Sequence, residues 1–362
     1  MNIKAPSSRS RGLLYASFKL LKTARSHPYR QQPDAEEVRS RRILSLIVFD
    51  LIQDDLTRFE TQLAAELRSS VAFIEAIGED LVSAGGKRLR PSLAFLAGRL
   101  LSADPDATMR VALATELLHS ASLLHDDLID DADTRRGHEA AFRRYGNVVS
   151  VMSGDFMLAR VLGLLARSHS SEFTALMSET AARICEGEVL QFQMATLETY
   201  SFENYFSIIE GKTAVLFAAA LEGVAMLSDA SEAEQRALRD FGVAYGYAFQ
   251  MRDDYLDLLG DAVTLGKPVG GDLREGKATY AVLTLLQSGV DEVRTVLRRH
   301  ASHEGDVARV QALIKEHGAD AQAKERIVLE TNKAVASLSV FPDSPAKEAL
   351  RTLAQRELER VI

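Results

Sequence analysis

The stretch LLHDDLIDD at residues 123–131 decides the predicted fold, because it places a cluster of acids inside an apolar helical pattern. Leucines recur at helical spacing along it, at Leu113, Leu117, Leu124 and Leu128. A second stretch, FQMRDDYLD at residues 249–257, repeats the arrangement D-D-x-x-D. The two stretches predict long helices that each present several carboxylates on one face.

The sequence between and around these motifs also favours helices. No proline occurs between Pro105 and Pro268, and that interval is rich in Ala, Leu, Glu and Arg, which form helices readily. No run of alternating Val, Ile and Thr joined by Asn-Gly or Asp-Gly signals a hairpin. We therefore predict one all-α domain over residues 43–362. Breaks between helices are expected at residues 85–86, 104–105, 260–276 and 341–345.

Composition excludes several classes of protein. The chain has 362 residues, a net charge of −8, 46% hydrophobic residues and one cysteine. This length supplies ample apolar material for a core. The single cysteine, Cys185, excludes an internal disulfide and hence a small disulfide-stapled scaffold. No apolar run of 18 residues lacks a charge, which argues against a membrane span, and the acidic balance argues against a general nucleic-acid binder.

The first residues have a different charge from the rest. Residues 1–33 carry seven Lys or Arg and no acid. We interpret residues 1–42 as a basic, disordered N-terminal extension. An Arg- and Ser-rich, acid-poor composition also fits a transit peptide, a membrane-surface helix around residues 12–26, or a start codon placed too early.

The spacing of the aspartates predicts a metal site. Asp126 and Asp130, like Asp253 and Asp257, are four residues apart, so each pair is offset by only about 40° around a helix and about 6 Å along it. Like charges so close repel each other unless water or a cation separates them. Oxygen ligands suit Mg²⁺, which binds carboxylates together with substrate phosphates. Two such motifs on apolar helices favour a metal site over a solvated face, and they predict a phosphorylated substrate.

Basic residues beside glycines supply the charge that would hold phosphates. The segment GGKRLRP at residues 85–91 precedes an apolar helical pattern, and such a segment at a helix N-terminus forms an anion site. Further residues of this kind are Arg135, Arg136, Lys212, Thr213, Lys267 and Lys277. Each alone would be interpreted as a solvated surface group. Their recurrence near the aspartates predicts one pocket that combines Mg²⁺ with phosphates.

Taken in this order, the motifs resemble the trans-isoprenyl diphosphate synthase family, also called polyprenyl synthetases. The resemblance covers roughly residues 45–362 and is greatest to the octaprenyl branch, which EGEVLQ at residues 186–191 and FPDSP at 341–345 also resemble. It implies a single bundle of about ten or more helices around a deep central cavity. It also implies a homodimeric, cytoplasmic, Mg²⁺-dependent enzyme, with three Mg²⁺ ions expected when substrate is bound. The segment GKATYA at residues 276–281 and the added acids Asp131 and Asp133 depart from the family pattern.

The resemblance also implies roles for single residues. The metal ligands are Asp126, Asp130 and Asp253, supported through bound water by Asp127, Asp254 and Asp257. Arg135, Lys212 and Lys267 resemble the residues that hold the allylic diphosphate. Lys87, Arg90, His119 and Arg136 resemble those that hold isopentenyl diphosphate, and Lys277 is placed with the substrate-binding residues. Thr213 and Gln250 resemble the groups that face the developing carbocation.

Small residues before the first motif predict a long product. In this family the residues one turn or more before the first aspartate form the wall of the elongation tunnel, and here they are Leu118, Ala121 and Ser122. Met177 is a candidate floor of the tunnel, although an ordinary core methionine is an equal alternative. The predicted reaction joins an allylic primer, farnesyl or geranylgeranyl diphosphate, to successive isopentenyl diphosphates, head to tail and trans. The predicted product is around octaprenyl diphosphate, for a quinone side chain, with peripheral membrane contact for its release.

Four alternatives remain at this point. A short-chain synthase making geranylgeranyl or farnesyl diphosphate would have the same sites and a shallower pocket. An ionisation-initiated terpene cyclase would replace the second aspartate motif, and a non-catalytic partner subunit would have lost one of the two. A helical binding protein with acidic faces would need every motif match to be a coincidence.

Overall fold

The computed structural model divides the chain into two units, Met1–Ile43 and Leu44–Ile362. It describes residues 50–359 of the second unit, except residues 84, 136–137 and 262–267. The predicted N-terminal extension, residues 1–42, lies outside the described residues and remains a prediction.

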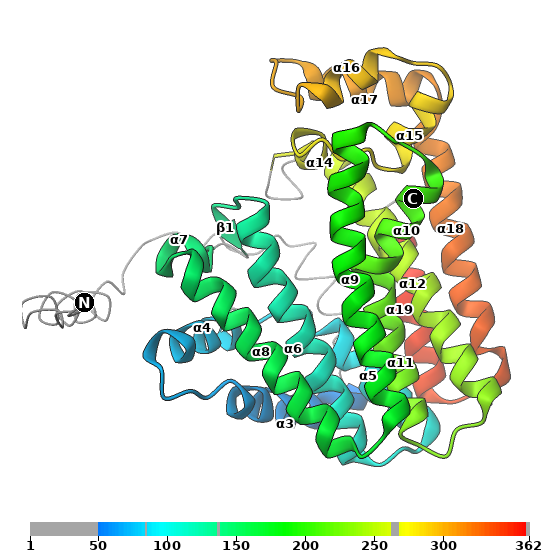
Figure 1. Ribbon diagram of the computed structural model, residues 1–362. Helices are drawn as coiled ribbons and strands as arrows, with labels where there is room; N and C mark the ends of the chain where they lie inside the picture. Colours follow the sequence, from blue (N-terminus) through cyan, green and yellow to red (C-terminus); the bar gives the residue numbers. More distant parts are fainter. Residues whose placement is uncertain (1–49, 84, 136–137, 262–267, 360–362) are drawn as a thin grey trace, which may run out of the picture. The chain divides into compact units, whose positions relative to one another are not determined.

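Helices form nearly all of the described unit (Figure 1). Its first half contains α3 (Asp50–Glu66), α4 (Ala72–Ser83), α5 (Leu89–Leu101), α6 (Pro105–Ile129), α7 (Ala141–Tyr145), α8 (Asn147–Ser168) and α9 (Ser171–Leu197). The chain continues with α10 (Phe202–Ile209), the π-helical turn η2 (Glu210–Ala214), α11 (Val215–Met226) and α12 (Glu232–Leu259). The last part contains α14 (Gly271–Arg274), α15 (Tyr280–Gln287), α16 (Glu292–Arg298), α17 (Asp306–Glu316), α18 (Ala319–Ser337), the 3₁₀ turn η3 (Leu338–Val340) and α19 (Pro345–Glu359).

The predicted all-α fold, a bundle of about ten or more helices, is thereby confirmed within the described residues. One small departure follows the first aspartate motif. There the strands β1 (Thr134–Arg135) and β2 (His138–Glu139) form a two-residue antiparallel pair, with Thr134 opposite Glu139. Such a short pair leaves no periodic signal in the sequence, because alternation needs about four residues or more to be recognised.

Local chemistry explains where α6 begins and ends. The side chain of Asp104 accepts hydrogen bonds from the backbone N–H groups of Asp106 and Ala107, and Pro105 occupies the first helical position. The helix ends at Ile129, and Asp131 has a left-handed backbone with φ of 50°. The first aspartate motif therefore straddles the end of its helix.

The second motif lies inside the last turns of α12. That helix begins with a capping box, in which Ser231 and Glu234 bond each other's backbone N–H groups. It ends at Leu259, next to Gly260. The residues of the second motif, 253–257, are thus fully helical, unlike those of the first.

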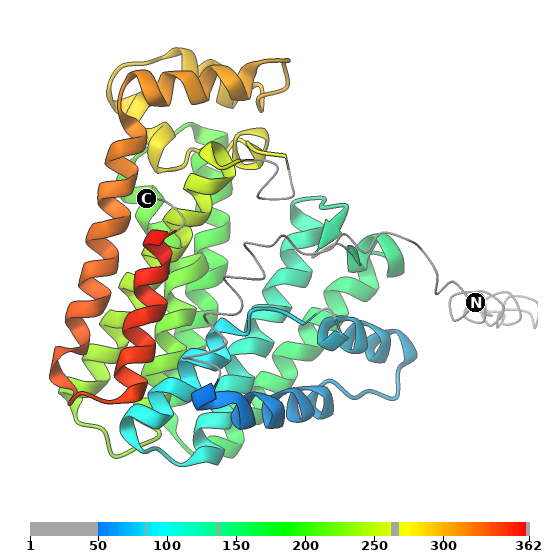
Figure 2. The same ribbon diagram turned by 180° about the vertical axis from the view of Figure 1, so that it is seen from behind.

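Close helix contacts hold α11, η2 and α12 together. A Cβ atom on Gly242 would lie 2.4 Å from the Cα of Ala218, and one on Gly246 would lie 2.4 Å from the Cα of Ala214. These glycines let α12 approach α11 and η2 backbone to backbone. Seen from behind, α18 and α19 lie along α12 (Figure 2), and both pack against it. On the other side of the core, α6 packs between α5 and α8.

The buried apolar residues form two clusters that meet along α12. One cluster includes Tyr245 on α12 and extends into α5, α6 and α11. The other includes Met251 and extends into α10, α15 and α18. Gln250 lies between these two positions, so polar groups at this level of α12 sit at the boundary between the clusters.

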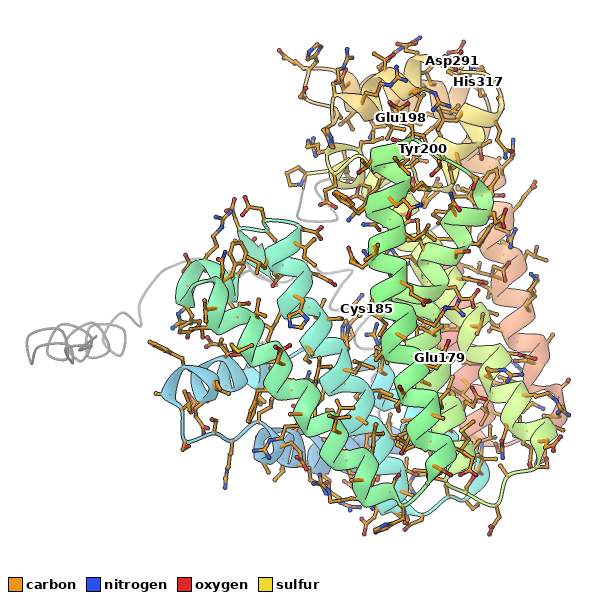
Figure 3. The ribbon with its side chains drawn as sticks, in the orientation of Figure 1. Glu179, Cys185, Glu198, Tyr200, Asp291 and His317 are labelled. Atoms are coloured by element: carbon orange, nitrogen blue, oxygen red, sulfur yellow. The ribbon has the colours of Figure 1, made fainter. Side chains whose placement is uncertain are left out.

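The C-terminal end of α9 is fixed against α16. Glu198 accepts hydrogen bonds from Arg298 at 2.6 and 2.8 Å and from Arg294 at 3.5 Å. Arg294 also lies over the ring of Tyr200, 5.7 Å from its centroid. Figure 3 shows Glu198 and Tyr200 at this end of α9, close to α16. The cluster holds the part of α9 that lines the site described next.

One described helix, α8, is long and apolar enough to cross a membrane by length and composition. Of its most apolar window, 39% is buried inside the protein. Partly buried core helices share these properties, so the observation is weak evidence for a span.

Candidate active site

The carboxylates of the first motif lie at the exposed end of α6. Asp127 is buried, Asp126 is partly exposed and Asp130 is exposed. The neighbouring Asp131 and Asp133, which were expected to enlarge the acid cluster, both pair with Arg143, at 2.7 and 3.2 Å. Arg143 therefore pairs with both added acids and offsets one of their two negative charges.

The second motif is enclosed by hydrogen bonds. Asp254 accepts a bond of 2.7 Å from the hydroxyl of Tyr205 on α10 and one of 2.8 Å from the amide of Gln250. Asp257 accepts a bond of 3.0 Å from the backbone N–H of Asp272. Burial raises the pKa of Asp254 to about 6, although the bonds from Gln250 and Tyr205 lower it. Asp254 and Asp257 are therefore rigidly held and poor in water, whereas Asp253 is exposed.

A pocket of about 110 Å³ lies beside the second motif. Its lining includes five predicted site residues: Lys212, Thr213, Gln250, Asp254 and Lys277. It also includes four polar residues that sequence reasoning did not assign to the site: Gln191, Tyr205, Asp272 and Thr279. The structure thus brings α9, η2, α12 and the segment around α14 to one place.

The π-helical turn η2 places Lys212 in this pocket. A Cβ on Gly211 would lie 2.5 Å from the carbonyl oxygen of Arg183, and one on Gly187 would lie 3.0 Å from the backbone nitrogen of Lys212. Because neither glycine has a side chain, η2 can pack directly against α9. The Lys212 ammonium pairs with Glu188 at 2.5 Å and donates to Gln191 at 3.1 Å. Widened π turns recur at functional sites because they shift side chains out of the regular helical order.

Thr213 and Gln250 are joined directly. The Thr213 hydroxyl donates to the side-chain oxygen of Gln250 at 2.8 Å, and the Gln250 amide group donates to Asp254. These two bonds together orient the Gln250 amide. The chain from Thr213 through Gln250 to Asp254 therefore connects η2 to the second motif.

Lys277 lies between the two aspartate motifs. Burial lowers the pKa of its ammonium group, but Glu275, Asp130 and Asp272 together raise it above its ordinary value. Asp130 belongs to the first motif, whereas Asp272 lies beside the second. Burial, followed by repulsion from Asp254 and Asp257, raises the pKa of Asp272 well above its ordinary value, and Lys277 opposes this. Lys277 is thus a positive group that interacts with Asp130 of the first motif and with Asp272 beside the second.

The basic loop before α5 is anchored by a residue that was not predicted to have a role. Arg88 is buried and bonds Glu60 at 2.7 and 3.0 Å and Glu116 at 2.9 Å. Its backbone is left-handed, with φ of 45°. Arg90 lies over the ring of Phe217, 4.7 Å from its centroid. Arg88 therefore holds the loop while the flanking Lys87 is exposed to solvent.

Several predicted site residues lie away from the pocket or outside the described structure. Lys87, Arg90 and His119 do not line the pocket beside the second motif. Arg136 and Lys267 fall outside the described residues, as does the side chain of Arg135 on β1. The predicted isopentenyl diphosphate site is therefore described only at Lys87, Arg90 and His119.

The predicted chain-length residues lie in the protein interior. Leu118 and Ala121 on α6 and Met177 on α9 are buried and belong to the same apolar cluster. Ser122 is partly buried, and its hydroxyl donates to the carbonyl oxygen of His119 at 2.9 Å. Their assignment to a tunnel wall and floor stays a prediction.

The missed residues differ in how well the sequence could have revealed them. Asp272 follows a Gly-Gly pair and precedes Lys277 by five residues, so the same reasoning that selected lysines beside glycines could have included it. Tyr205 and Arg88 carry no such signal, because their partners are 49 and 28 residues away in the sequence.

The donor chemistry suits a hard divalent cation. Asp254 and Asp257 both repel Asp272, and such repulsion between carboxylates is the kind that a bound cation relieves. Among the described residues, no three Asp, Glu, His or Cys side chains are close enough to form a complete metal site. A cation would therefore fit here together with a diphosphate, whose oxygens complete its ligand set.

Fold and site together define the class of the protein as an isoprenoid synthase, a helical bundle with acidic motifs beside a pocket. The polyprenyl synthetase family matches residues 71–317. The chain belongs to this family, whose members are prenyltransferases that use a divalent metal.

Named relatives agree with this assignment. The octaprenyl diphosphate synthase of Escherichia coli is 36% identical over 315 residues, covering 86% of this chain and 97% of the relative. The crystal structure of a decaprenyl diphosphate synthase from Rhodobacter capsulatus matches with a TM-score of 0.82 and 32% identity, covering 87% of this chain and 98% of that one. A polyprenyl synthase from Caulobacter crescentus, complexed with calcium and isoprenyl diphosphate, matches with a TM-score of 0.80 and 38% identity, covering 87% and 97%.

Proposed function

We propose that this protein is a Mg²⁺-dependent trans-polyprenyl diphosphate synthase that makes a product of around octaprenyl length for a quinone side chain. The observation that carries the proposal is the pocket in which Lys212, Thr213 and Gln250 meet the second aspartate motif. Similarity to an octaprenyl diphosphate synthase over 97% of that relative supports the long-chain assignment.

The first step breaks the C–O bond of the allylic diphosphate, and the bonding electron pair leaves with the diphosphate oxygen. Lys212 and Lys277 lie in the pocket and stabilise this developing negative charge electrostatically. Arg135 and Lys267 are proposed to contribute further positive charge that stabilises the leaving diphosphate. Glu188 and Gln191 hold the Lys212 ammonium in place before substrate arrives.

The second step forms the new C–C bond. The Thr213 hydroxyl oxygen and the Gln250 amide oxygen lie together and present partial negative charge to the allylic cation. Lys87, Arg90, His119 and Arg136 are proposed to hold isopentenyl diphosphate so that its double bond attacks this cation. The released diphosphate accepts the proton that is then lost, which regenerates an allylic diphosphate five carbons longer.

Asp126, Asp130 and Asp253 are the proposed ligands of Mg²⁺, with Asp127, Asp254 and Asp257 acting through bound water. When bound, three Mg²⁺ ions would neutralise the diphosphate as it leaves. We add Asp272 to these proposed Mg²⁺-binding carboxylates, because it lies close enough to Asp254 and Asp257 to be repelled by both.

A product assay tests the proposed function. Purified protein is incubated with Mg²⁺, labelled isopentenyl diphosphate and either geranyl, farnesyl or geranylgeranyl diphosphate, and chain lengths are measured by mass spectrometry. We expect products of about seven isoprene units or more. Products that stop at four units would support a short-chain synthase instead. No elongation with any primer would contradict the proposal.

The length of the product is tested by Ala121→Phe. Ala121 is buried on α6, five residues before Asp126. A phenyl ring there is expected to shorten the product by several isoprene units while turnover persists, because it would fill the tunnel before the chain is complete. Ala225→Val, at another buried alanine, on α11, is the control for packing effects and should leave the product length unchanged. An unchanged length in Ala121→Phe would remove this residue from the tunnel wall.

We also propose a homodimer and a cytoplasmic location. The apolar side chains of Val148, Met152 and Leu162 on α8 are exposed, and a second copy of the chain would cover them. Sedimentation equilibrium distinguishes a dimer from a monomer. Peripheral contact with a membrane would allow a long apolar product to leave.

A further inference from the structure

A buried pair of opposite charges joins the second aspartate motif to the C-terminal helix. Arg252 lies within the motif on α12, and Glu357 lies near the end of α19, 105 residues later. Both residues are buried, each with 4% of its surface exposed. Buried charges are stable when each has a partner and further hydrogen bonds, so the surroundings of the pair are informative.

Arg252 is held on three sides. One terminal nitrogen donates to Glu357, while Nε and the other terminal nitrogen donate to one oxygen of Asp253, at 3.1 and 2.5 Å. The guanidinium also lies 4.7 Å from the centroid of the Phe249 ring. The second oxygen of Glu357 accepts a bond of 3.2 Å from the hydroxyl of Tyr245. Arg252 therefore bonds a proposed metal ligand on one side and Glu357 on the other.

This arrangement sets the charge available at Asp253. The Asp253 side chain is 46% exposed, unlike the buried Asp254 and Asp257. An arginine bonded to Asp253 alone would compete with a cation for its negative charge. Because Glu357 supplies a second negative charge, Arg252 can orient Asp253 without neutralising it.

The pair also lies near the basic loop. Burial raises the pKa of the Glu357 carboxyl, and Arg252 and, more weakly, Lys87 oppose this rise. Lys87 is a proposed isopentenyl diphosphate residue. Glu357 is thus close to charged groups of both proposed substrate-binding regions.

We propose that Arg252 and Glu357 are positioning residues for Asp253: Arg252 orients its carboxylate, and Glu357 balances Arg252 so that Asp253 keeps its charge for a divalent cation. The inference rests on the proposed function. It goes beyond the motif itself, because it assigns a role in cation binding to the C-terminal helix.

The test compares Glu357→Gln, Arg252→Met and the double variant. Two quantities are measured: the Mg²⁺ concentration that gives half-maximal activity, and the rise in Tm that Mg²⁺ with inorganic diphosphate produces without turnover. In Glu357→Gln, Arg252 loses the negative charge of Glu357, so its positive charge competes with the cation for Asp253. Half-maximal activity should then need at least about threefold more Mg²⁺. The rise in Tm at a fixed Mg²⁺ concentration should shrink in parallel.

The double variant separates charge balance from packing. Removing Arg252 as well removes the competing charge together with the orientation of Asp253, so the Mg²⁺ requirement should fall below that of Glu357→Gln and match that of Arg252→Met within about twofold. If the pair served packing alone, both single variants would lower Tm, and neither would change the Mg²⁺ requirement. That result would overturn the inference.

Glu222→Gln is the matched control. Glu222 on α11 is also buried and pairs with an arginine of α12, Arg239, at 3.5 Å. Arg239 lies about 20 Å along α12 from Arg252. Glu222→Gln should alter Tm but not the Mg²⁺ requirement.

Two further measurements keep the inference testable. Glu357→Asp retains the charge and should keep the Mg²⁺ requirement close to that of the unmodified protein, which provides a test if Glu357→Gln does not fold; a raised requirement in Glu357→Asp would overturn the inference. The rise in Tm with Mg²⁺ and diphosphate does not depend on elongation. If the unmodified protein shows this rise but no product forms, the proposed function fails while the inference about Asp253 can still be judged.

Discussion

The two aspartate motifs share one spacing, but the surroundings of their third aspartates are opposite. The first straddles the end of α6, where Asp130 is exposed and the chain turns at Asp131. The second lies within α12, where Tyr205 and Gln250 bond Asp254 and the backbone of Asp272 bonds Asp257. The third aspartate is therefore solvated in the first motif and enclosed in the second, whereas the middle aspartates, Asp127 and Asp254, are both buried.

The difference matters because a carboxylate that is held firmly in position and a carboxylate that ionises readily need different surroundings. An enclosed carboxylate is held in position but resists carrying charge, as the raised pKa of Asp254 demonstrates. An exposed carboxylate ionises readily but has fewer contacts to hold it. Lys277 interacts with Asp130 of the first motif and with Asp272 beside the second, and so connects the two environments. The predictions below test this contrast.

The largest effect is expected from removing one proposed metal ligand in each motif. Asp126→Ala and Asp253→Ala should each lower kcat/KM by at least about 10²-fold, because each removes charge that would hold the cations. The steady-state incorporation of labelled isopentenyl diphosphate measures this. Asp131→Ala is the control, since Asp131 pairs with Arg143, and it should retain activity within about threefold. Comparable losses in all three variants would contradict the distinction between the motif and its neighbouring acids.

The next effect concerns the pH dependence of stability in the presence of a chelator. The pKa of Asp254 is about 6 in the folded protein, above its ordinary value of 3.8. Between these values the folded state binds more protons than the unfolded state, so this group lowers the free energy of unfolding as the pH rises. Asp254→Asn removes that contribution and should gain up to about 3 kcal/mol relative to the unmodified protein between pH 4 and pH 7.

Urea denaturation at several pH values measures this gain. Parallel profiles for Asp254→Asn and the unmodified protein would show that the second motif is not enclosed as described.

The smallest effect is expected from single hydrogen bonds. Tyr205→Phe removes a donor from the buried Asp254 and should lower the free energy of unfolding by about 1–2 kcal/mol. Ser122→Ala, just before the first motif, removes a bond within α6 and should change it by less than about 0.5 kcal/mol. Chemical denaturation of both variants measures the difference. Equal losses would mean that the two motifs are supported alike.

Much of the fold followed from local patterns. Proline and aspartate placed the start of α6, leucine spacing indicated its buried face, and the basic segment at residues 85–91 was expected to lead into a helix, as it does at α5. The chemistry of the pocket was also predictable in part, because Lys212, Thr213, Asp254 and Lys277 were selected by local motif, Gln250 was implied by the family resemblance, and all five line it. These signals are short in sequence, so no knowledge of packing was needed.

The environment of each group was not predictable from such patterns. Arg143 was not expected to pair with Asp131 and Asp133, and the carboxylate of Asp272 was missed. Likewise, nothing in the sequence around Arg88 indicated that it would be buried between Glu60 and Glu116. A partner several helices away leaves no periodic trace.

The sequence by itself determined that the chain forms helices, where many of them begin, and which residue types could bind a cation and a diphosphate. Helix formation and capping depend on neighbours within about four residues, so the local sequence determines them. The tertiary structure decided which carboxylates of the two motifs are buried, that η2 turns Lys212 toward Glu188, and that Glu357 balances Arg252. Burial and charge pairing depend on which distant segments meet, and this is settled when α9, α10, α12 and α19 pack together.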